Sequence, residues 1–447
     1  MSPSDPDMSH SNEYERGSLS LLSTVALGTG VMIGAGIFAL TGQIAELAGP
    51  LFPLAFVAGA VVSGFSAYSY IRVSSVYPSA GGVAMILKKA YGPGVIAAAA
   101  SLMMALSMVV SQSLVARTFS TYALRPFGLQ EQAVAVPVLA VLVIAAALAI
   151  NLAGSQVVGR VATATSAIKI VGIVLFGAVG IWSSGLSFRA AEHGWTDGTG
   201  VGAFVGATAL AILAFKGFTT ITNSGDEVVE PEKNVGRAII ISLLLSLAVY
   251  LVVAFAVGSA LGVQEIIDAR DYALAEAARP ALGSVGVTAT VILALVATSS
   301  GILASMFAVS RMLAMLTKMK LIPHSHFGMP GTMPDHTTVY VAVLAGGMAA
   351  FFDLSRIASL GVFLYLAMDM IIHVGVGWKL REEVDTRSWV VVTAFVLDAI
   401  ILATFTVMRL KSDPLIVGVG VVTTLVLFGS SWWFLRDADD GGAHEVG

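Results

Sequence analysis

The chain has 447 residues, of which 57% are hydrophobic and only 12% are charged; its formal net charge is −4, and it contains no cysteine. Soluble domains carry about 25% charged residues, so this composition, together with repeated apolar runs, predicts an integral membrane protein. No basic run stands out, which argues against nucleic-acid binding. The lack of cysteine excludes disulfides, thiolate chemistry and cysteine metal ligands.

The chain opens with a polar, acidic segment, residues 1–17, which lacks the layout of a cleavable signal peptide. We expect a disordered cytoplasmic tail there and a second cytoplasmic tail at 436–447. A hydrocarbon core about 30 Å thick requires roughly 20 apolar residues of helix, and continuous apolar runs exclude the alternating strands of a membrane barrel. The sequence predicts twelve spans: 19–47, 51–73, 92–122, 132–151, 157–183, 200–225, 236–262, 284–315, 337–352, 355–379, 388–409 and 415–435.

The distribution of lysine and arginine predicts how these spans are oriented. With the N-terminus inside, fourteen of the 24 basic residues fall in cytoplasmic segments and seven on the other side, the rest lying within or near the ends of spans. Because basic residues concentrate on the cytoplasmic side of membrane proteins, this bias places both termini in the cytoplasm. The longest outer loop, 263–283, has helical spacing and is expected to form a short amphipathic piece at the surface.

Glycines interrupt the first predicted span. The stretch GTGVMIGAGIF, 28–38, contains four of them, and each costs about 1 kcal/mol relative to alanine in a helix. Gly30 and Gly34 form a GxxxG pattern, which by itself indicates close helix packing. A nucleotide-binding loop is disfavoured because no strand precedes the glycines and the spacing is not GxGxxG.

A second interruption falls in the sixth span, where Gly217 sits at mid-depth with polar residues behind it. Spans 1 and 6 each open a group of five spans, 19–183 and 200–379, and they enter the membrane from opposite sides. Two interrupted helices at matching places in inverted halves indicate the binding site of a transporter. An unwound helix exposes amide N–H groups and carbonyls, so we expect the broken backbone itself to bind ligand.

Three motifs then carry a resemblance to a known family. GTGVMIGAGIFALTG (28–42) is similar to the first-helix signature of the amino acid–polyamine–organocation (APC) superfamily. YPSAGGVAMILKKAYGP (77–93) resembles its first cytoplasmic loop. GFTTITNSGDEVVEPEKNVGRAI (217–239) resembles its sixth-helix tail, with Asp226 and Glu227 at the paired-acid positions.

The resemblance covers the first ten spans, with the motifs in order. It implies an all-α membrane protein with the leucine-transporter fold, in which two inverted five-helix repeats form one transporter domain, 18–435, with peripheral helices at 388–435. Two positions depart from the family pattern. Thr219 stands where the family often has an acidic residue, and Lys216 stands where an apolar residue is usual, so the identity of the substrate stays open.

The residues expected to contact substrate lie at the two interruptions, with one serine from the third span that packing alone would also explain. They are Ile33, Gly34, Ala35, Gly36, Ser107, Phe215, Lys216, Gly217 and Phe218. Lys216 beside the broken backbone fits a substrate with a carboxylate. Structural pairing with a neighbouring carboxylate is the alternative for this lysine.

Lys169 lies about 13 Å into the fifth span at 1.5 Å per residue, and ionisable groups at such depth are functional by default. The resemblance places a lysine here in several sodium-independent members, with its ammonium where relatives hold a sodium ion. Ser299 and Ser300 would add oxygens to this coupling site. A lysine that snorkels to the interface is the alternative.

Span 10 carries Tyr365, Asp369 and His373 at i, i+4 and i+8, on one helix face. Two interpretations stay open for Asp369 and His373: polar contacts that join helices, or a proton path that contributes to coupling. Asp398 in span 11 is expected to lie outside the transport core.

The sequence therefore predicts a secondary active transporter of amino acids in the cytoplasmic membrane, working by alternating access, sodium-independent and either proton-coupled or an exchanger. No cofactor, metal or nucleic acid is expected, only a small substrate, protons and the lipid bilayer. An enzyme is disfavoured because HExxH, GxSxG and His/Asp clusters at metal spacing are absent from the sequence. The alternatives are a transporter of polyamines, organic cations or small carboxylates, or a non-transporting sensor of the same fold; two lysines near the site disfavour a cation.

Overall fold

The computed structural model describes residues 17–442 apart from 80, 154, 185–186, 192–199 and 324–331. Within its helices, the side chains at positions 35, 155–164, 166–167 and 437–442 also lie outside the description. The expected tails are therefore described only at Gly17 and, for the second, as a helical backbone that runs to Gly442. In the described part of the chain every regular element is a helix, which confirms the all-α prediction.

The long helices follow the predicted order. In chain order the α-helices are α1 (Leu21–Val31), α2 (Ile37–Ala48), α3 (Phe52–Val76), α4 (Gly82–Tyr91), α5 (Val95–Leu124), α6 (Ala135–Leu152), α7 (Ser155–Ser183), α8 (Val201–Phe215), α9 (Phe218–Asn223), α10 (Pro231–Ala260), α11 (Val263–Asp268), α12 (Ala273–Ala277), α13 (Arg279–Lys318), α14 (Met333–Phe351), α15 (Leu354–Val374), α16 (Ser388–Ser412) and α17 (Pro414–Gly442). Two π-helical segments, η1 (Met32–Gly36) and η6 (Gly375–Lys379), interrupt or extend them, and the short 3₁₀ turns are η2 (Gly49–Leu51), η3 (Arg125–Phe127), η4 (Arg189–Ala191) and η5 (Gly225–Glu227).

Each predicted span coincides with one helix or with consecutive helices. The first corresponds to α1, η1 and α2, and the sixth to α8 and α9. Among the residues that the structure describes, nine helical stretches are long and apolar enough to cross a bilayer by themselves, so the total of twelve crossings stays a prediction. The outer loop expected to contain helical structure does so, as α11 and α12.

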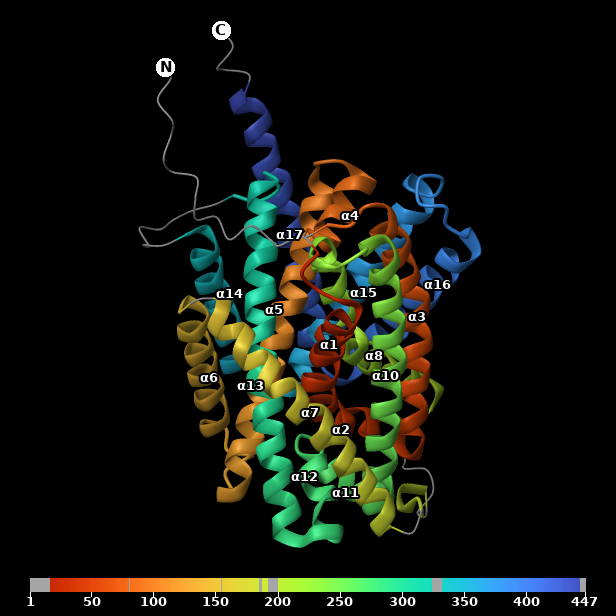
Figure 1. The fold of residues 1–447 in the computed structure, drawn as a ribbon, viewed down its shortest axis with the longest axis vertical. Coiled ribbons are helices and arrows are strands. Elements are labelled where there is room, and N and C mark those ends of the chain that lie inside the picture. The colour runs from red at the N-terminus through yellow and green to blue at the C-terminus, as the bar shows by residue number, and fades with distance from the viewer. Residues whose placement is uncertain are drawn as a thin grey trace.

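The helices stand roughly parallel, with α4 near one end of the bundle and α11 and α12 at the opposite end (Figure 1). The five predicted spans between these two loops would place them on opposite sides of the membrane. The 40-residue α13 runs the length of the bundle and packs against α5 and α7, while α10 packs against α3 and α7. This arrangement encloses the two interrupted spans.

A backbone strap ties the start of the chain to the segment after α9. Leu19 N–H donates to Glu227 O at 2.7 Å, Val229 N–H donates to Leu19 O at 2.9 Å, and Gly17 N–H reaches Asp226 O at 3.4 Å. These bonds form an isolated parallel bridge between Leu19 and Val228. The strap therefore joins the entrance of α1 to the paired-acid segment that connects α9 with α10.

The loop motif at 77–93 and the tail motif at 217–239 meet at glycines. Gly82 has a left-handed backbone (φ +47°), and a Cβ there would overlap Asn223 Oδ1, which accepts a hydrogen bond from Val83 N–H at 3.2 Å. Across the same contact, a Cβ at Gly225 would lie 3.0 Å from the backbone nitrogen of Ser79. Both glycines are needed because two backbones approach closely.

We predict that Gly82→Ala destabilises the protein more than Gly128→Ala does. Both glycines have positive φ, which costs alanine about 1–2 kcal/mol, but a Cβ at Gly128 has open space around it. At Gly82 the added methyl also disrupts the contact with Asn223, an overpacking cost of about 1–3 kcal/mol. Thermal unfolding of the purified variants measures the difference, and equal losses would show that the contact between α4 and α9 contributes nothing.

Candidate functional site

The first interruption is a π-helical segment and not an unwound turn. Met32–Gly36 forms η1, and the flanking residues Val31 and Ile37 keep right-handed helical dihedral angles. The expectation that glycines unwind this helix is therefore wrong. A π segment accommodates one extra residue while it keeps the helix continuous, and it leaves carbonyls nearby without a regular helical donor.

The second interruption is a break in the helix, at the position that the sequence predicts. α8 ends at Phe215, α9 begins at Phe218, and Lys216 and Gly217 form the turn between them. Their carbonyls accept hydrogen bonds from Thr219 and Thr220, three residues further on, at 3.0 and 3.1 Å. This i to i+3 pattern replaces the α-helical i to i+4 pattern at the break.

Glycines allow the π segment and the helix break to pack directly against each other. A Cβ at Gly36 would lie 2.9 Å from Ala214 Cβ, and one at Gly217 would lie 2.7 Å from Met32 Cγ. At Gly34 a Cβ would make ordinary contacts, 3.4 Å from Ala297 O and 3.5 Å from Lys169 Nζ. Close packing therefore accounts for Gly36 and Gly217, whereas Gly34 faces a charged side chain.

The hydroxyl of Tyr250 in α10 joins the two irregular segments. Its oxygen lies 2.6 Å from the carbonyl of Met32 in η1 and 3.1 Å from the carbonyl of Ala214 in α8, and it donates to them. The rings of Phe56 and Phe215 enclose the phenol, with centroids 5.2 and 5.0 Å away. Sequence reasoning missed Tyr250, because a tyrosine inside an apolar span carries no local signal of its partners.

Lys216 is 9% exposed and reaches across to α5. Its ammonium donates to the carbonyl and the hydroxyl of Ser107 at 2.8 and 3.1 Å, and Ser107 Oγ in turn donates to Gly361 O of α15 at 3.4 Å. Ser107 is thus brought to the helix break. In the described part of the chain no carboxylate forms an ion pair with Lys216, so pairing with a protein carboxylate is not observed there. An ammonium has three N–H donors, and these bonds use two.

Lys169 of α7 is 4% exposed and points toward the first span. Its ammonium donates to Gly30 O at 3.1 Å, one residue before the end of α1, so the side chain does not snorkel to the interface. Ser300 Oγ donates to Ala297 O of its own helix at 3.1 Å and not to the lysine, and Ser299 on the same helix is half-buried. Lys169 therefore forms a direct hydrogen bond to a backbone carbonyl of α1.

Apolar and aromatic side chains form the surroundings of this junction. Ile33 is 1% exposed, Phe215 and Phe218 are fully buried, and the ring of Phe218 meets that of Tyr70 edge-on at 5.3 Å. The side chain of Ala35, also expected to contact substrate, lies outside the described residues. The expected substrate residues that are described thus lie at or next to one buried junction.

The polar residues of span 10 lie in a separate buried cluster with α3 and α16. Asp369 accepts hydrogen bonds from Ser66 Oγ at 2.5 Å and Tyr70 Oη at 2.6 Å. His373 Nε2 lies 3.6 Å from Asp369 Oδ2 and 3.3 Å from Asp398 Oδ2. The sequence predicts that Asp398 lies outside the transport core; in the structure α16 turns this carboxylate inward, toward His373 of α15.

An apolar hollow of about 430 Å³ lies between α7 and α13, away from the interrupted spans. Its lining includes Leu175, Val179 and Ile292, which are among the exposed apolar side chains, and Thr290 is the one polar side chain in it. A charged or zwitterionic ligand would find no partners there, so this hollow is not the candidate site.

Comparisons with known proteins agree with this geometry. A family model described as amino acid permease matches residues 19–431. The chain is 30% identical over 389 residues to the inner membrane transport protein YbaT of Escherichia coli, covering 87% of this chain and 89% of the relative. It is 26% identical to the vacuolar cationic amino acid transporter 2 of Arabidopsis thaliana (80% of this chain, 59% of the relative) and 28% identical to the branched-chain amino acid permease BcaP of Lactococcus lactis (51% and 52%). The chain therefore belongs to the amino acid permease family, whose members are membrane transporters, and has its all-α fold.

Proposed function

We propose that this protein is a secondary active transporter of neutral amino acids in the cytoplasmic membrane, with both termini inside. Alternating access would operate around the junction of η1 and the break between α8 and α9. The observation that carries the proposal is the buried ammonium of Lys216, whose observed partners are the two uncharged oxygens of Ser107.

A buried cation without an anionic partner favours a ligand that brings a carboxylate. Leaving a charge unpaired in an apolar interior is costly, and a bound carboxylate would offset that cost through a charge-assisted hydrogen bond to the remaining N–H. The same positive charge repels polyamines and organic cations. Lys169 strengthens this preference, since it also lies near the first span without a carboxylate ion pair among the described residues.

The apolar surroundings favour an amino acid with an uncharged side chain. Phe215, Phe218 and Ile33 offer hydrocarbon surface beside Lys216 and the helix break. The names of the relatives cover both cationic and branched-chain amino acids, so they do not decide between the two classes. The charge at the junction supports the neutral class. Small carboxylates remain the second candidate, because they share the carboxylate but lack the amine.

We predict that Lys216→Met weakens binding of neutral amino acids by at least about 30-fold, while binding of the corresponding amino acid amides changes little. Removing one partner of a buried charge pair costs about 2–5 kcal/mol, and each 1.4 kcal/mol is a factor of ten in Kd. Ligand-dependent thermal stabilisation measures this, since a ligand at 100 times its Kd adds about 2.7 kcal/mol of apparent stability.

Lys379→Met is the matched control, because Lys379 is exposed in η6. An equal loss for acids and amides would contradict direct contact between Lys216 and the carboxylate. If small carboxylates without an amine stabilise the protein and amino acids do not, the substrate class is small carboxylates and not amino acids.

We further propose that transport is sodium-independent and that Lys169 couples it to protons or regulates exchange. As an ammonium, Lys169 forms a charge-assisted hydrogen bond with Gly30 O and holds the end of α1 against α7. Loss of its proton would weaken that bond and release this half of the first span. A coupling ion acts by binding one access state better than the other, which such a bond would do. Asp369 and His373 would serve as a proton path, and Ser299 and Ser300 would add oxygens in a second access state.

We predict that Lys169→Ala abolishes concentrative amino acid uptake and leaves the protein folded. The variant lacks the only described side-chain donor to Gly30 O, so the charge state at this position can no longer bias α1. Uptake into proteoliposomes with imposed sodium and proton gradients measures the effect, with Lys169→Arg as a control that stays charged at every pH tested. Accumulation driven by a sodium gradient, or unchanged pH dependence in Lys169→Ala, would contradict the proposal.

A further inference from the structure

The cluster formed by Asp369, His373 and Asp398 is buried between three helices. Asp369 and His373 lie four residues apart on one face of α15, and Asp398 faces them from α16. All three are at most 1% exposed, and one oxygen or nitrogen of each lies within 4.8 Å of the others. Asp398 lies about 15 Å along α16 from its first residue at 1.5 Å per residue, well away from the end of the helix.

The charges of this cluster do not balance unless it binds a further cation. Two carboxylates and one imidazolium would leave a net charge of −1 in an apolar interior, which is strongly disfavoured. Within the described residues, the other titratable groups that face the cluster are two phenols, Tyr70 of α3 and Tyr365 of α15.

Groups on the neighbouring elements are engaged elsewhere. On α3, Arg72 donates to the carbonyls of Val384 and Asp385. At the end of α8, Lys216 donates to Ser107, and on α4 the hydroxyl of Tyr91 donates to Ile371 O. Among the described residues, these neighbouring groups therefore do not supply the missing positive charge, which a proton on one of the three residues would provide.

The two carboxylates have different surroundings. Both oxygens of Asp369 accept short hydrogen bonds, at 2.5 and 2.6 Å, from Ser66 and Tyr70. Hydroxyl groups donate at such distances to ionised carboxylates, so this pattern fits an anionic Asp369. Neither oxygen of Asp398 has a hydrogen-bond partner among the described residues, and His373 Nε2 lies 3.3 Å from its Oδ2.

We propose that Asp398 binds a proton, so that the resting cluster consists of an ionised Asp369, an imidazolium at His373 and a neutral carboxylic acid at Asp398. The proton attaches to a carboxylate oxygen that otherwise has no donor, and the cluster becomes neutral. Ser69 Oγ, 2.9 Å from His373 Nδ1, fixes the ring so that Nε2 faces both carboxylates. The site goes beyond the proposed function, because it links α16 to α3 and α15 whatever the substrate.

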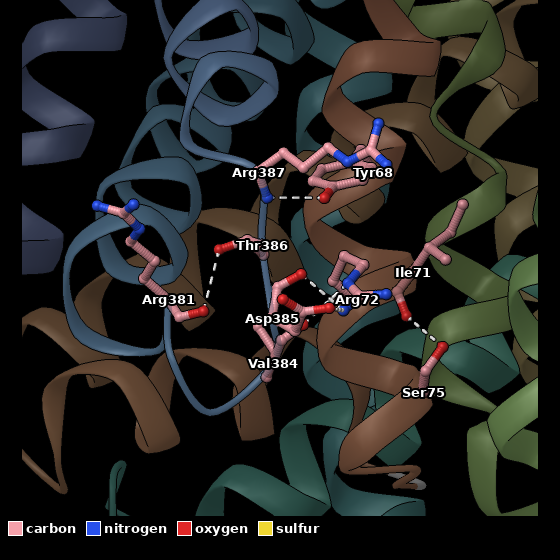
Figure 2. A network of polar contacts seen from close by, with 9 residues as sticks. All are labelled: Tyr68, Ile71, Arg72, Ser75, Arg381, Val384, Asp385, Thr386 and Arg387. Atoms are coloured by element: carbon pink, nitrogen blue, oxygen red, sulfur yellow. Dashed lines mark hydrogen bonds and ion pairs between the residues drawn. The ribbon is translucent and has the colours of Figure 1, made fainter.

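The segment that precedes α16 makes a second contact with α3 (Figure 2). Arg72 donates to Val384 O at 2.8 Å and to Asp385 O at 2.6 Å, and Arg387 N–H donates to Tyr68 Oη at 2.8 Å. In α3, Tyr68 immediately precedes Ser69 and Tyr70, and Arg72 follows them after one intervening residue. The segment before α16 and the cluster are therefore held by the same two turns of α3, which preorganises the site.

Substitution by asparagine tests the assignment, because asparagine has the shape of a protonated aspartate. The measurement is the infrared carbonyl band of a buried neutral carboxylic acid, recorded near neutral pH and identified by its shift in D₂O. We expect the wild-type protein to show this band, Asp398→Asn to lose it while staying folded, and Asp369→Asn to keep it while losing thermal stability. Asp268→Asn, at an exposed residue, is the matched control and should change neither property.

Absence of the band in the wild-type protein would overturn the proposal, and this outcome does not depend on the folding of any variant. Loss of the band in Asp369→Asn but not in Asp398→Asn would place the proton on the other carboxylate and also overturn it. Elemental analysis that finds one bound metal ion in the wild-type protein and none in Asp398→Asn would show a different cation at the site. None of these readouts involves transport, so failure of the proposed substrate or coupling leaves them unaffected.

Discussion

Backbone polar groups inside a bilayer must find hydrogen-bond partners within the protein, and this constraint explains the centre of the structure. Where α1 passes into η1 and where α8 stops, helical carbonyls lose their regular donors. Side chains from other helices supply the replacements: Tyr250 for Met32 and Ala214, and Lys169 for Gly30. Irregular backbone at this depth is stabilised by side-chain donors from two other helices, α10 and α7.

The two lysines contribute to this hydrogen bonding in different ways. Lys169 satisfies a backbone carbonyl of the first span from α7, whereas Lys216 leaves its own span to bind Ser107 on α5. Each lysine therefore ties an irregular segment to a continuous helix. A third polar centre, around Asp369, connects α15 with α3 and α16 through hydroxyl donors and an imidazole. In the described part of the chain these three polar centres therefore each join helices that are distant in the sequence.

Much of this architecture is predictable from the sequence, because long apolar runs define the helices and glycines with polar neighbours mark the irregular positions. The form of the irregularity is not predictable: the glycines around Gly34 give a π segment, since whether a helix unwinds depends on donors such as Tyr250 that come from distant spans. For the same reason the sequence leaves two interpretations of Lys216 open, contact with substrate or pairing with a neighbouring carboxylate. The partner observed in the structure is a serine, Ser107. The contact between Asp398 and His373 is not predictable either, because the sequence gives the order of the helices but not which of their faces meet.

The strap between Leu19 and Val228 has a mechanical consequence. Backbone hydrogen bonds link the entrance of α1 to the connector between α9 and α10, so the two interrupted spans are coupled at their ends as well as at their centres. A displacement of α1 would therefore be transmitted to the connector, and with it to the contact between Asn223 and α4.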